Sequence, residues 1–396
     1  MRNIFNKRIY LDSAAGITGN ASSPHEEGRR AKQMLEDART AIARLVEVQS
    51  DDVVFTSGAT ESNALALLGI AKKGDHVLYL PSAHASIVEN IKLLSERGVE
   101  VEALPITEER VDCEKLKEFV RPETTLITMD AVCGETGVVW NTREVAEVLH
   151  SAGKTKKGCA LAARPIQHPF FISPAAFLHV DASQAPLTEK ISRSHFGADM
   201  LSLDASKVGT ARGIGALIAH RTIPISPLYA GGGQERGLRS GSIHPELAKS
   251  FANDLYSAVR HHEQFRSSAE KARAQLIKNI TSFIPNVLIN EGSSPDRQAP
   301  NILNLSFPGG DPSRRAGAEV DTDYLVALLD EDDFAVSTRS ACETDSEEGS
   351  RAVFALTGDI LRARSTLRIS WDKRVRLSEL TRFAKALKRA VAFIGY

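Results

Sequence analysis

The segment 201–217, LSLDASKVGTARGIGAL, combines two short strand patterns with one lysine between them. Leu201 and Leu203 alternate with polar residues, as in a strand that has one apolar face. Lys207 follows that strand, and the glycines after it permit tight turns and close backbone approach. A lysine packed in this way loses solvent and charge, which an amine needs to form a Schiff base with an aldehyde. A solvated loop lysine is the alternative, so an active Lys207 needs support from the rest of the chain.

The composition is that of an ordinary globular protein. The chain has 396 residues, of which 42% are hydrophobic and 25% charged, and this length allows two domains. A formal net charge of −1 gives no reason to expect binding to nucleic acid or to an anionic membrane. No apolar run reaches membrane-spanning length, and the first residues lack the core of a signal peptide. We therefore expect a soluble, cytoplasmic protein.

The cysteines are expected to be free thiols. Cys113, Cys133, Cys159 and Cys342 show no metal-type spacing such as CxxC, so no metal site is expected. In a reducing compartment they do not pair as disulfides.

Strand and helix patterns alternate from about residue 50 to residue 220. This alternation predicts an α/β fold, with a mostly parallel sheet and helices on both faces. Ligands of such sheets bind at the carboxyl ends of the strands. His84, Asp181, Gln184 and Lys207 all fall at these predicted ends, which supports a site there.

The last third of the chain predicts a smaller α+β domain. A long helical pattern begins at Pro245 and continues to about residue 280, and strand and helix patterns follow it. We expect a large domain over residues 11–262 and a small domain made from residues 1–10 and 263–396. Residues 153–174 have three prolines and little periodicity, so they are predicted to form an inserted surface loop.

Two segments have the composition of anion sites. TSGATES, residues 56–62, lies between a strand and a helix pattern, where backbone N–H groups suit a phosphate; an ordinary capped helix is the alternative. Residues 227–242, PLYAGGGQERGLRSGS, are cationic and glycine-rich, and form either an anion clamp or a linker. An amine, a carboxylate, a ring for stacking and a phosphate site together match pyridoxal phosphate.

The chain resembles the cysteine desulfurases, in the class V branch of the type I fold of pyridoxal-phosphate enzymes. The motifs occur in the family's order over nearly the whole chain: YLDSAAG, GNASSPH, FTSGATESN, GETGVV, HVDASQ, GGGQERGLRSGS, SFPG, VSTRSAC and LRIS. The resemblance implies a homodimeric enzyme that uses pyridoxal 5′-phosphate to convert L-cysteine to L-alanine. It also implies that the sulfur passes through a persulfide to an iron–sulfur scaffold or another acceptor protein, for cluster assembly or tRNA thiolation.

The resemblance also assigns roles to individual residues. It makes Lys207, His84 and Cys342 the catalytic residues, and Arg368 the residue that binds the substrate carboxylate. Cys342 is the nucleophile, in a loop of mainly small and polar residues, and lies 26 residues before Arg368. The cofactor contacts that it implies are Ala59, Thr60, His84, Asp181, Gln184, Ser206, Lys207 and, from a second subunit, Ser242.

Several positions depart from the family pattern. Cys133 and Gly134 replace a pair of asparagines, so one amide contact is missing. Asp204 and Ser206 replace a serine and a histidine. A carboxylate near a phosphate is unfavourable unless it turns away or bonds to a donor such as Arg212 or Arg239.

These departures keep other functions open. Selenocysteine lyases and aminotransferases of class V share Lys207, Asp181 and the phosphate site, and Cys342 is the feature that separates a desulfurase from them. A non-catalytic relative that acts as a binding subunit is the remaining alternative.

Overall fold

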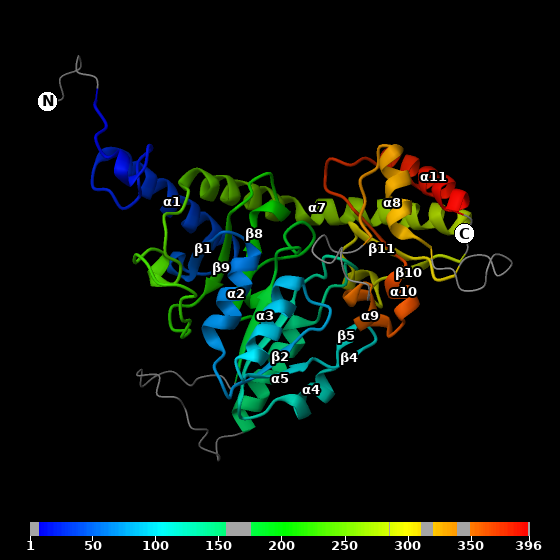
Figure 1. The fold of residues 1–396 in the computed structure, drawn as a ribbon, viewed down its shortest axis with the longest axis horizontal. Coiled ribbons are helices and arrows are strands. Elements are labelled where there is room, and N and C mark those ends of the chain that lie inside the picture. The colour runs from blue at the N-terminus through cyan, green and yellow to red at the C-terminus, as the bar shows by residue number, and fades with distance from the viewer. Residues whose placement is uncertain (1–7, 156–175, 285, 310–319, 339–348, 395–396) are drawn as a thin grey trace.

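The computed structural model describes residues 8–155, 176–284, 286–309, 320–338 and 349–394. These residues form a seven-stranded sheet and a three-stranded sheet, and a small hairpin of β4 (Ile106–Thr107) and β5 (Arg110–Val111). The long helix α7 (Pro245–Phe283) runs past both larger sheets (Figure 1).

The large sheet has the order β1-β9-β8-β7-β6-β2-β3. Its strands are β1 (Val53–Thr56), β2 (His76–Tyr79), β3 (Glu100–Ala103), β6 (Thr124–Asp130), β7 (Phe177–Asp181), β8 (Met200–Asp204) and β9 (Gly215–Ala219). Among the described strands of this sheet, β9 alone runs in the opposite direction, and it pairs antiparallel with both β1 and β8. The predicted hairpin around Lys207 is present, since Leu203 of β8 pairs with Ala216 of β9. The expected α/β fold with a mostly parallel sheet is confirmed.

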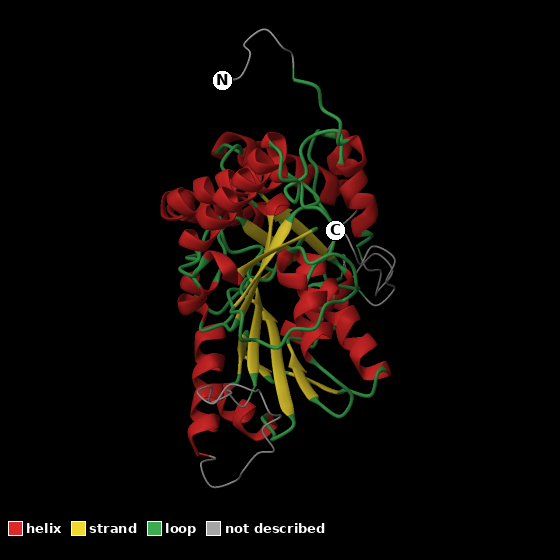
Figure 2. Cartoon of the chain, turned by 90° about the vertical axis from the view of Figure 1, so that its left-hand side faces the viewer, coloured by secondary structure: helices red, strands yellow, loops and turns green. Residues whose placement is uncertain are grey.

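Helices cover both faces of this sheet (Figure 2). They are α1 (Glu26–Leu45), α2 (Ala59–Ile70), α3 (Ala85–Glu96), α4 (Cys113–Phe119), α5 (Thr142–Thr155) and α6 (Arg193–Phe196). On α1 the buried residues Leu35, Ala38 and Ile42 recur at helical spacing and form the stripe that faces the core. Such stripes explain why periodicity located these helices in the sequence.

The smaller sheet has the order β10-β11-β12, all antiparallel. Its strands are β10 (Leu288–Asn290), β11 (Ile302–Ser306) and β12 (Thr366–Ser370), and its helices are α8 (Thr322–Glu331), α9 (Arg351–Thr357), α10 (Ile360–Arg364) and α11 (Leu377–Ile394). Leu380, Phe383 and Leu387 of α11 are buried in a core that this sheet shares. This core is separate from the core of the large sheet.

The two cores meet along α7. Val259 packs against the core of the large sheet, and Phe265 packs against the core of the small sheet. The change between the cores therefore falls within one continuous helix, near residue 262.

Of the N-terminal residues 1–10 expected in the small domain, the structure describes 8–10, and these do not join the small sheet. Ile9 and Leu11 are exposed, and the segment lies beside α1, at the other end of the molecule (Figure 1). Arg8 pairs with Glu27 of α1, and the Tyr10 hydroxyl donates to the carbonyl of Gly16. Of these contacts, the Arg8–Glu27 pair links the segment to α1, whereas the Tyr10 bond is local; a three-residue apolar run offers too little surface to determine where it packs.

Most of the predicted inserted loop lies outside the described residues, although α5 extends to Thr155. In the part of the chain that is described, no helix is long and apolar enough to cross a membrane.

Candidate active site

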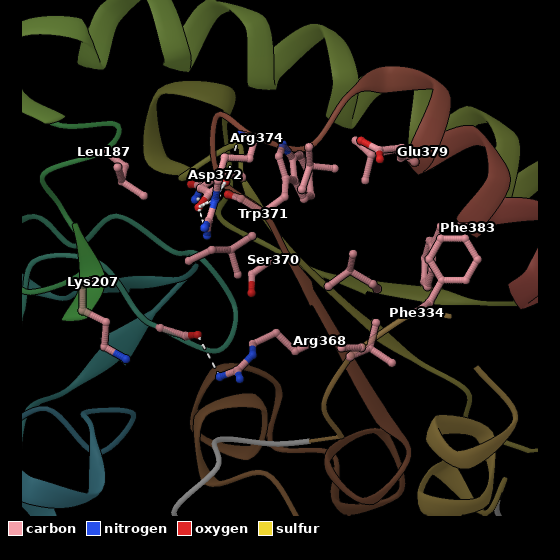
Figure 3. A pocket seen from close by; sticks show the side chains of 18 of the residues that line it. Leu187, Lys207, Phe334, Arg368, Ser370, Trp371, Asp372, Arg374, Glu379 and Phe383 are labelled. Atoms are coloured by element: carbon pink, nitrogen blue, oxygen red, sulfur yellow. Dashed lines mark hydrogen bonds and ion pairs between the residues drawn. The ribbon is translucent and has the colours of Figure 1, made fainter. Parts of the chain in front are cut away.

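A cavity of about 830 Å³ lies between the two sheets. Lys207 enters it from the large sheet, and Arg368 of β12 enters it from the small sheet (Figure 3). Gly134, Gln184 and Ser206 also line it. The cavity therefore brings together residues that are more than a hundred positions apart in the sequence and that the sequence assigned to one site.

Lys207 is the last residue of η3 (Ala205–Lys207), directly after β8. The glycines pack closely, as expected: a Cβ on Gly209 would meet the side chain of Asp254 at 1.9 Å, and one on Gly215 would meet the carbonyl of Leu203 at 2.6 Å. Lys207 itself is nevertheless exposed in the single chain. The expectation of a desolvated lysine fails here, because the side chain extends into a cavity and does not pack against those glycines.

Asp181, at the end of β7, is buried and held by two donors. Its Oδ2 accepts from Asn63 Nδ2 at 2.7 Å, and its Oδ1 accepts from the Ser183 backbone N–H at 2.9 Å. Asp130 pairs with Asp181 in register on the neighbouring strand. Burial, followed by the charge of Asp181, raises the pKa of Asp130 well above its usual value. Asp130 therefore favours its protonated form.

Asn63 is a residue of this site to which the sequence analysis gave no role. It is fully buried on α2, and its amide also donates to the Ser86 hydroxyl at 2.9 Å. The signal in the sequence was a polar amide on the otherwise apolar run that follows TSGATES.

His84 caps the start of α3. Its Nδ1 accepts from the Ser86 backbone N–H at 3.2 Å and lies 2.8 Å from the Ser86 hydroxyl. A hydrogen-bonded chain therefore connects His84 to Asp181 through Ser86 and Asn63. Because Nδ1 accepts, a neutral His84 carries its proton on Nε2. The ring is exposed, so Nε2 can exchange protons with a ligand.

Asp204 takes up the predicted phosphate donors. One carboxylate oxygen accepts from the backbone N–H of Ala59, the first residue of α2, at 2.8 Å. The other oxygen accepts from the Ser206 N–H at 2.8 Å and from the Ser206 hydroxyl at 2.6 Å. Thr60 is exposed at the same helix start.

The arginines expected to neutralise Asp204 do not provide these donors. Arg239 pairs with Glu61 at 3.2 Å, and Arg212 is exposed. The donors are backbone and hydroxyl groups; the Ala59 N–H is at the first position of α2, where a helix leaves its backbone N–H groups without an intrahelical acceptor.

Gly134 is matched to Gln184. A Cβ on Gly134 would lie 2.9 Å from Gln184 Nε2, so the glutamine amide occupies the space where a side chain at residue 134 would begin. The carbonyl of Gly134 accepts from Arg368 Nη1 at 3.3 Å. The missing asparagine is therefore replaced in space by Gln184, from another strand end.

Ser242 lies at a different cavity in the single chain. That cavity, of about 440 Å³, is lined by residues near α1 and the glycine-rich segment, and Asn20 Nδ2 donates to the Ser242 hydroxyl at 3.2 Å. Buried Glu235 holds this segment through Arg39, with two N–O distances of 2.7 Å. Ser242 is thus not brought together with Lys207 within one chain.

The described cysteines are poor nucleophiles. Burial raises the pKa of the Cys133 thiol to about 11, and burial also raises the pKa of Cys113. The thiolate is the reactive form, so neither residue suits a nucleophilic role. Cys342, the predicted nucleophile, and Cys159 lie outside the described residues.

A lysine at the end of a strand, in a cavity between a mostly parallel sheet and a smaller α+β unit, is typical of one class of enzymes. The family model for aminotransferase class-V matches residues 9–156 and 172–383, and the chain belongs to that family. The match is interrupted where the sequence predicts the inserted loop.

Similar proteins narrow the group further. The chain is 29% identical over 342 residues to "Cysteine desulfurase IscS 1" of Archaeoglobus fulgidus, covering 85% of this chain and 80% of that protein. It is 31% identical over 336 residues to "Cysteine desulfurase IscS" of Rickettsia typhi, covering 83% and 73%. A solved structure called a NifS-like protein superposes with a TM-score of 0.79 at 26% identity, covering 95% of this chain and 92% of that one. The fold is therefore the type I fold of pyridoxal-phosphate enzymes.

Members of this family depend on pyridoxal phosphate. The residues present fit the ring and its aldehyde, since an amine and an amide face the cavity and a buried carboxylate stands on the neighbouring strand end. At the phosphate end, Asp204 already holds the Ala59 N–H and the Ser206 hydroxyl. The site thus fits the pyridoxal ring. At the phosphate end it differs from an ordinary anion site, because a carboxylate already accepts hydrogen bonds from the donors.

Proposed function

We propose that this protein is a cysteine desulfurase, which converts L-cysteine to L-alanine and passes the sulfur to Cys342 as a persulfide. The observation that carries this proposal is the meeting of Lys207 and Arg368 in one cavity. An amine that can bind an aldehyde cofactor then lies opposite a guanidinium that can bind the carboxylate of an amino acid. The named relatives are cysteine desulfurases, which favours cysteine among the possible amino acids.

Pyridoxal phosphate would be held by Lys207, by Asp181 at its pyridine nitrogen, by Gln184 at its phenolic oxygen and by stacking on His84. Ala59, Thr60 and Ser206 would approach its phosphate, with Ser242 of a second subunit. When bound, the cofactor supplies an electron sink that weakens the bonds of the substrate α-carbon. Asn63 and Ser183 keep the Asp181 carboxylate oriented for its contact.

Arg368 orients the substrate by its carboxylate. Its own orientation is fixed by the Gly134 carbonyl and by the pairing of β12 with β11. The Lys207 amine, which lies in the same cavity as Arg368, would accept the α-proton of the substrate. The Nε2 of His84 can hold or release a second proton, because its Nδ1 is engaged as an acceptor.

Sulfur transfer is assigned to Cys342. Its thiolate attacks the substrate sulfur, a sulfur–sulfur bond forms, and the bond between that sulfur and the β-carbon breaks. The electron pair stays with the β-carbon, which takes a proton and becomes the methyl group of alanine. The persulfide then carries a sulfur atom to an acceptor protein. The raised pKa values of Cys113 and Cys133 support Cys342 over both for this step.

The assembly and cellular role are part of the same proposal. We infer a homodimer, because Ser242 does not face Lys207 in its own chain and would complete the site of a second subunit. We also infer a cytoplasmic location for this dimer. We infer that the acceptor is an iron–sulfur scaffold or a protein of tRNA thiolation, as the family resemblance of the sequence implies.

The experiment is to incubate the protein with pyridoxal phosphate and cysteine, and to measure alanine and sulfide beside amino transfer to a keto acid. We expect alanine and sulfide in the parent, loss of both in Cys342→Ser, and a persulfide mass on Cys342. Cys113→Ser is the matched control and keeps its activity. Amino transfer without sulfide would assign an aminotransferase instead, and a persulfide on Cys133 would refute the choice of nucleophile.

A further inference from the structure

Asp204 stands where the donors for a phosphate converge. It is the last residue of β8 and the N-cap of η3, three positions before Lys207. Its carboxylate bonds to the Ala59 N–H at the start of the twelve-residue helix α2 and to both donors of Ser206. These are the donors that the family resemblance gives to the cofactor phosphate.

The surrounding backbone is fitted to this carboxylate. Gly58, the N-cap of α2, has a φ of +151°, and a Cβ there would lie only 3.1 Å from Asp204 Oδ2. A Cβ on Gly215 would lie 2.7 Å from the Cα of Gly58, so β9 and the helix start leave little room for the carboxylate to withdraw toward them. The carboxylate of Asp204, which is half-buried, thus lies against the same turn that would receive a phosphate.

The nearby arginine does not offset this charge. Arg239 is paired with Glu61, which also accepts from the Tyr229 hydroxyl and from the Ser57 N–H. Two carboxylates, Asp204 and Glu61, therefore share the start of α2. A phosphate that enters must break the three hydrogen bonds of Asp204 and then remain close to a displaced negative charge.

We propose that Asp204 is an internal anion in the phosphate cradle, and that it makes this chain nearly indifferent to the phosphate of its cofactor. The inference rests on the proposed function, because it assumes that Lys207 binds a pyridoxal-type aldehyde. The ring and the aldehyde then supply most of the affinity, while the phosphate gains little over a neutral substituent. Asp204 is in this sense a residue that determines specificity, and it has no part in the chemical step.

The test compares two aldehydes that differ at the phosphate end. Pyridoxal phosphate carries the dianion, whereas 5′-deoxypyridoxal lacks it and cannot close on its own aldehyde. Apparent dissociation constants for both are measured from the visible absorbance of the lysine-bound forms, on the full chain. The variants are Asp204→Ser, which restores a hydroxyl, and Asp204→Asn, which keeps the shape without the charge. Asp112→Asn is the control, since Asp112 caps α4 in the same way, through the N–H groups of Glu114 and Lys115.

The parent chain should prefer pyridoxal phosphate by less than about tenfold. Asp204→Ser and Asp204→Asn should raise that preference at least about tenfold through tighter binding of pyridoxal phosphate alone, and Asp112→Asn should leave it unchanged. An unchanged preference in both Asp204 variants would overturn the proposal. If neither variant folds, the parent alone decides, because a preference above about tenfold is incompatible with an occupied cradle. A chain that binds neither aldehyde, in the parent or in Asp204→Ser, would refute the cofactor assignment itself and this inference with it.

Discussion

Replacing Glu235 by alanine should destabilise the large domain strongly. Glu235 is the first residue of η4 (Glu235–Gly237), and its side chain is 3% exposed. Its two oxygens accept from Arg39 at 2.7 Å each, and one of them also accepts from the Phe55 N–H at 2.7 Å. Glu235 thus connects the glycine-rich segment both to α1 and to β1.

The expected loss is about 3 kcal/mol of unfolding free energy, at the lower end for breaking a buried ion pair, because Glu36, at 3.3 Å from Arg39 and 46% exposed, still offsets part of the Arg39 charge. Arg39 keeps a contact to the Val53 carbonyl and its pair with Glu36 at 3.3 Å, but its guanidinium, with a side chain only 10% exposed, loses its buried counterion. The variant Glu235→Gln retains an acceptor for Phe55 and should lose less. The double variant Arg39→Met/Glu235→Leu should recover much of the loss, since an apolar pair needs no counterion.

The assay is urea denaturation followed by circular dichroism, with Glu114→Ala as the control. Glu114 pairs with Lys117 at the surface, and its side chain is 83% exposed, so its removal should cost at most about 1 kcal/mol. A Glu235→Ala protein within about 1 kcal/mol of the parent would refute the reasoning, because the pair would then be offset by water or by relaxation of the segment.

Three further predictions follow from buried groups near the site. Burial lowers the pKa of His179 to about 4, so between about pH 6.5 and 4 the unfolded chain binds a proton there that the folded chain does not. The difference in unfolding free energy between the parent and His179→Gln should therefore be complete above about pH 6.5 and fall by about 1.4 kcal/mol per pH unit below it. A difference that does not change with pH would contradict this reasoning. The Cys133 thiol, with a pKa of about 11, should resist iodoacetamide at pH 8 in the folded protein and react on unfolding, as peptide mapping would show; rapid labelling of the folded protein would contradict its burial. Gly134→Asn should displace the flexible end of Gln184 and cost at most about 1 kcal/mol of unfolding free energy, and adding Gln184→Ala should remove that cost; a loss above about 3 kcal/mol that Gln184→Ala does not relieve would contradict this account.

Patterns of short range predicted most of the fold. Helix α1 and the hairpin of β8 and β9 follow from apolar spacing alone, because one face of each is buried. The strand β10 escaped prediction because its three residues are too few to show a period, and it is held by pairing with β11, a long-range contact. The placement of residues 8–11 beside α1 depends on a pair between Arg8 and Glu27, which no spacing rule reveals.

The sequence predicted which residues belong to the candidate site better than it predicted which groups those residues contact. The rule that ligands bind at strand ends placed Asp181, Gln184 and Lys207 on one edge, because parallel strands end together. Their partners come from elsewhere in the chain: Asn63 reaches Asp181 from α2, and Arg368 reaches Gly134 from the other sheet. Such partners are determined by tertiary packing, so single-sequence patterns indicate only that a polar group is present.

The departures from the family pattern acquire a physical meaning only in three dimensions, and they differ in kind. At Gly134 a side chain is lost, and Gln184 fills the space, so the change is matched within the chain. At Asp204 a charge is gained, and the Ala59 N–H and Ser206 satisfy it without a basic partner. A matched loss of volume leaves the chemistry of the cavity intact, whereas an anion bonded to the phosphate donors changes which ligand the cavity prefers. The substitution at Asp204 is therefore the one through which this chain differs in binding from a family member with serine at that position.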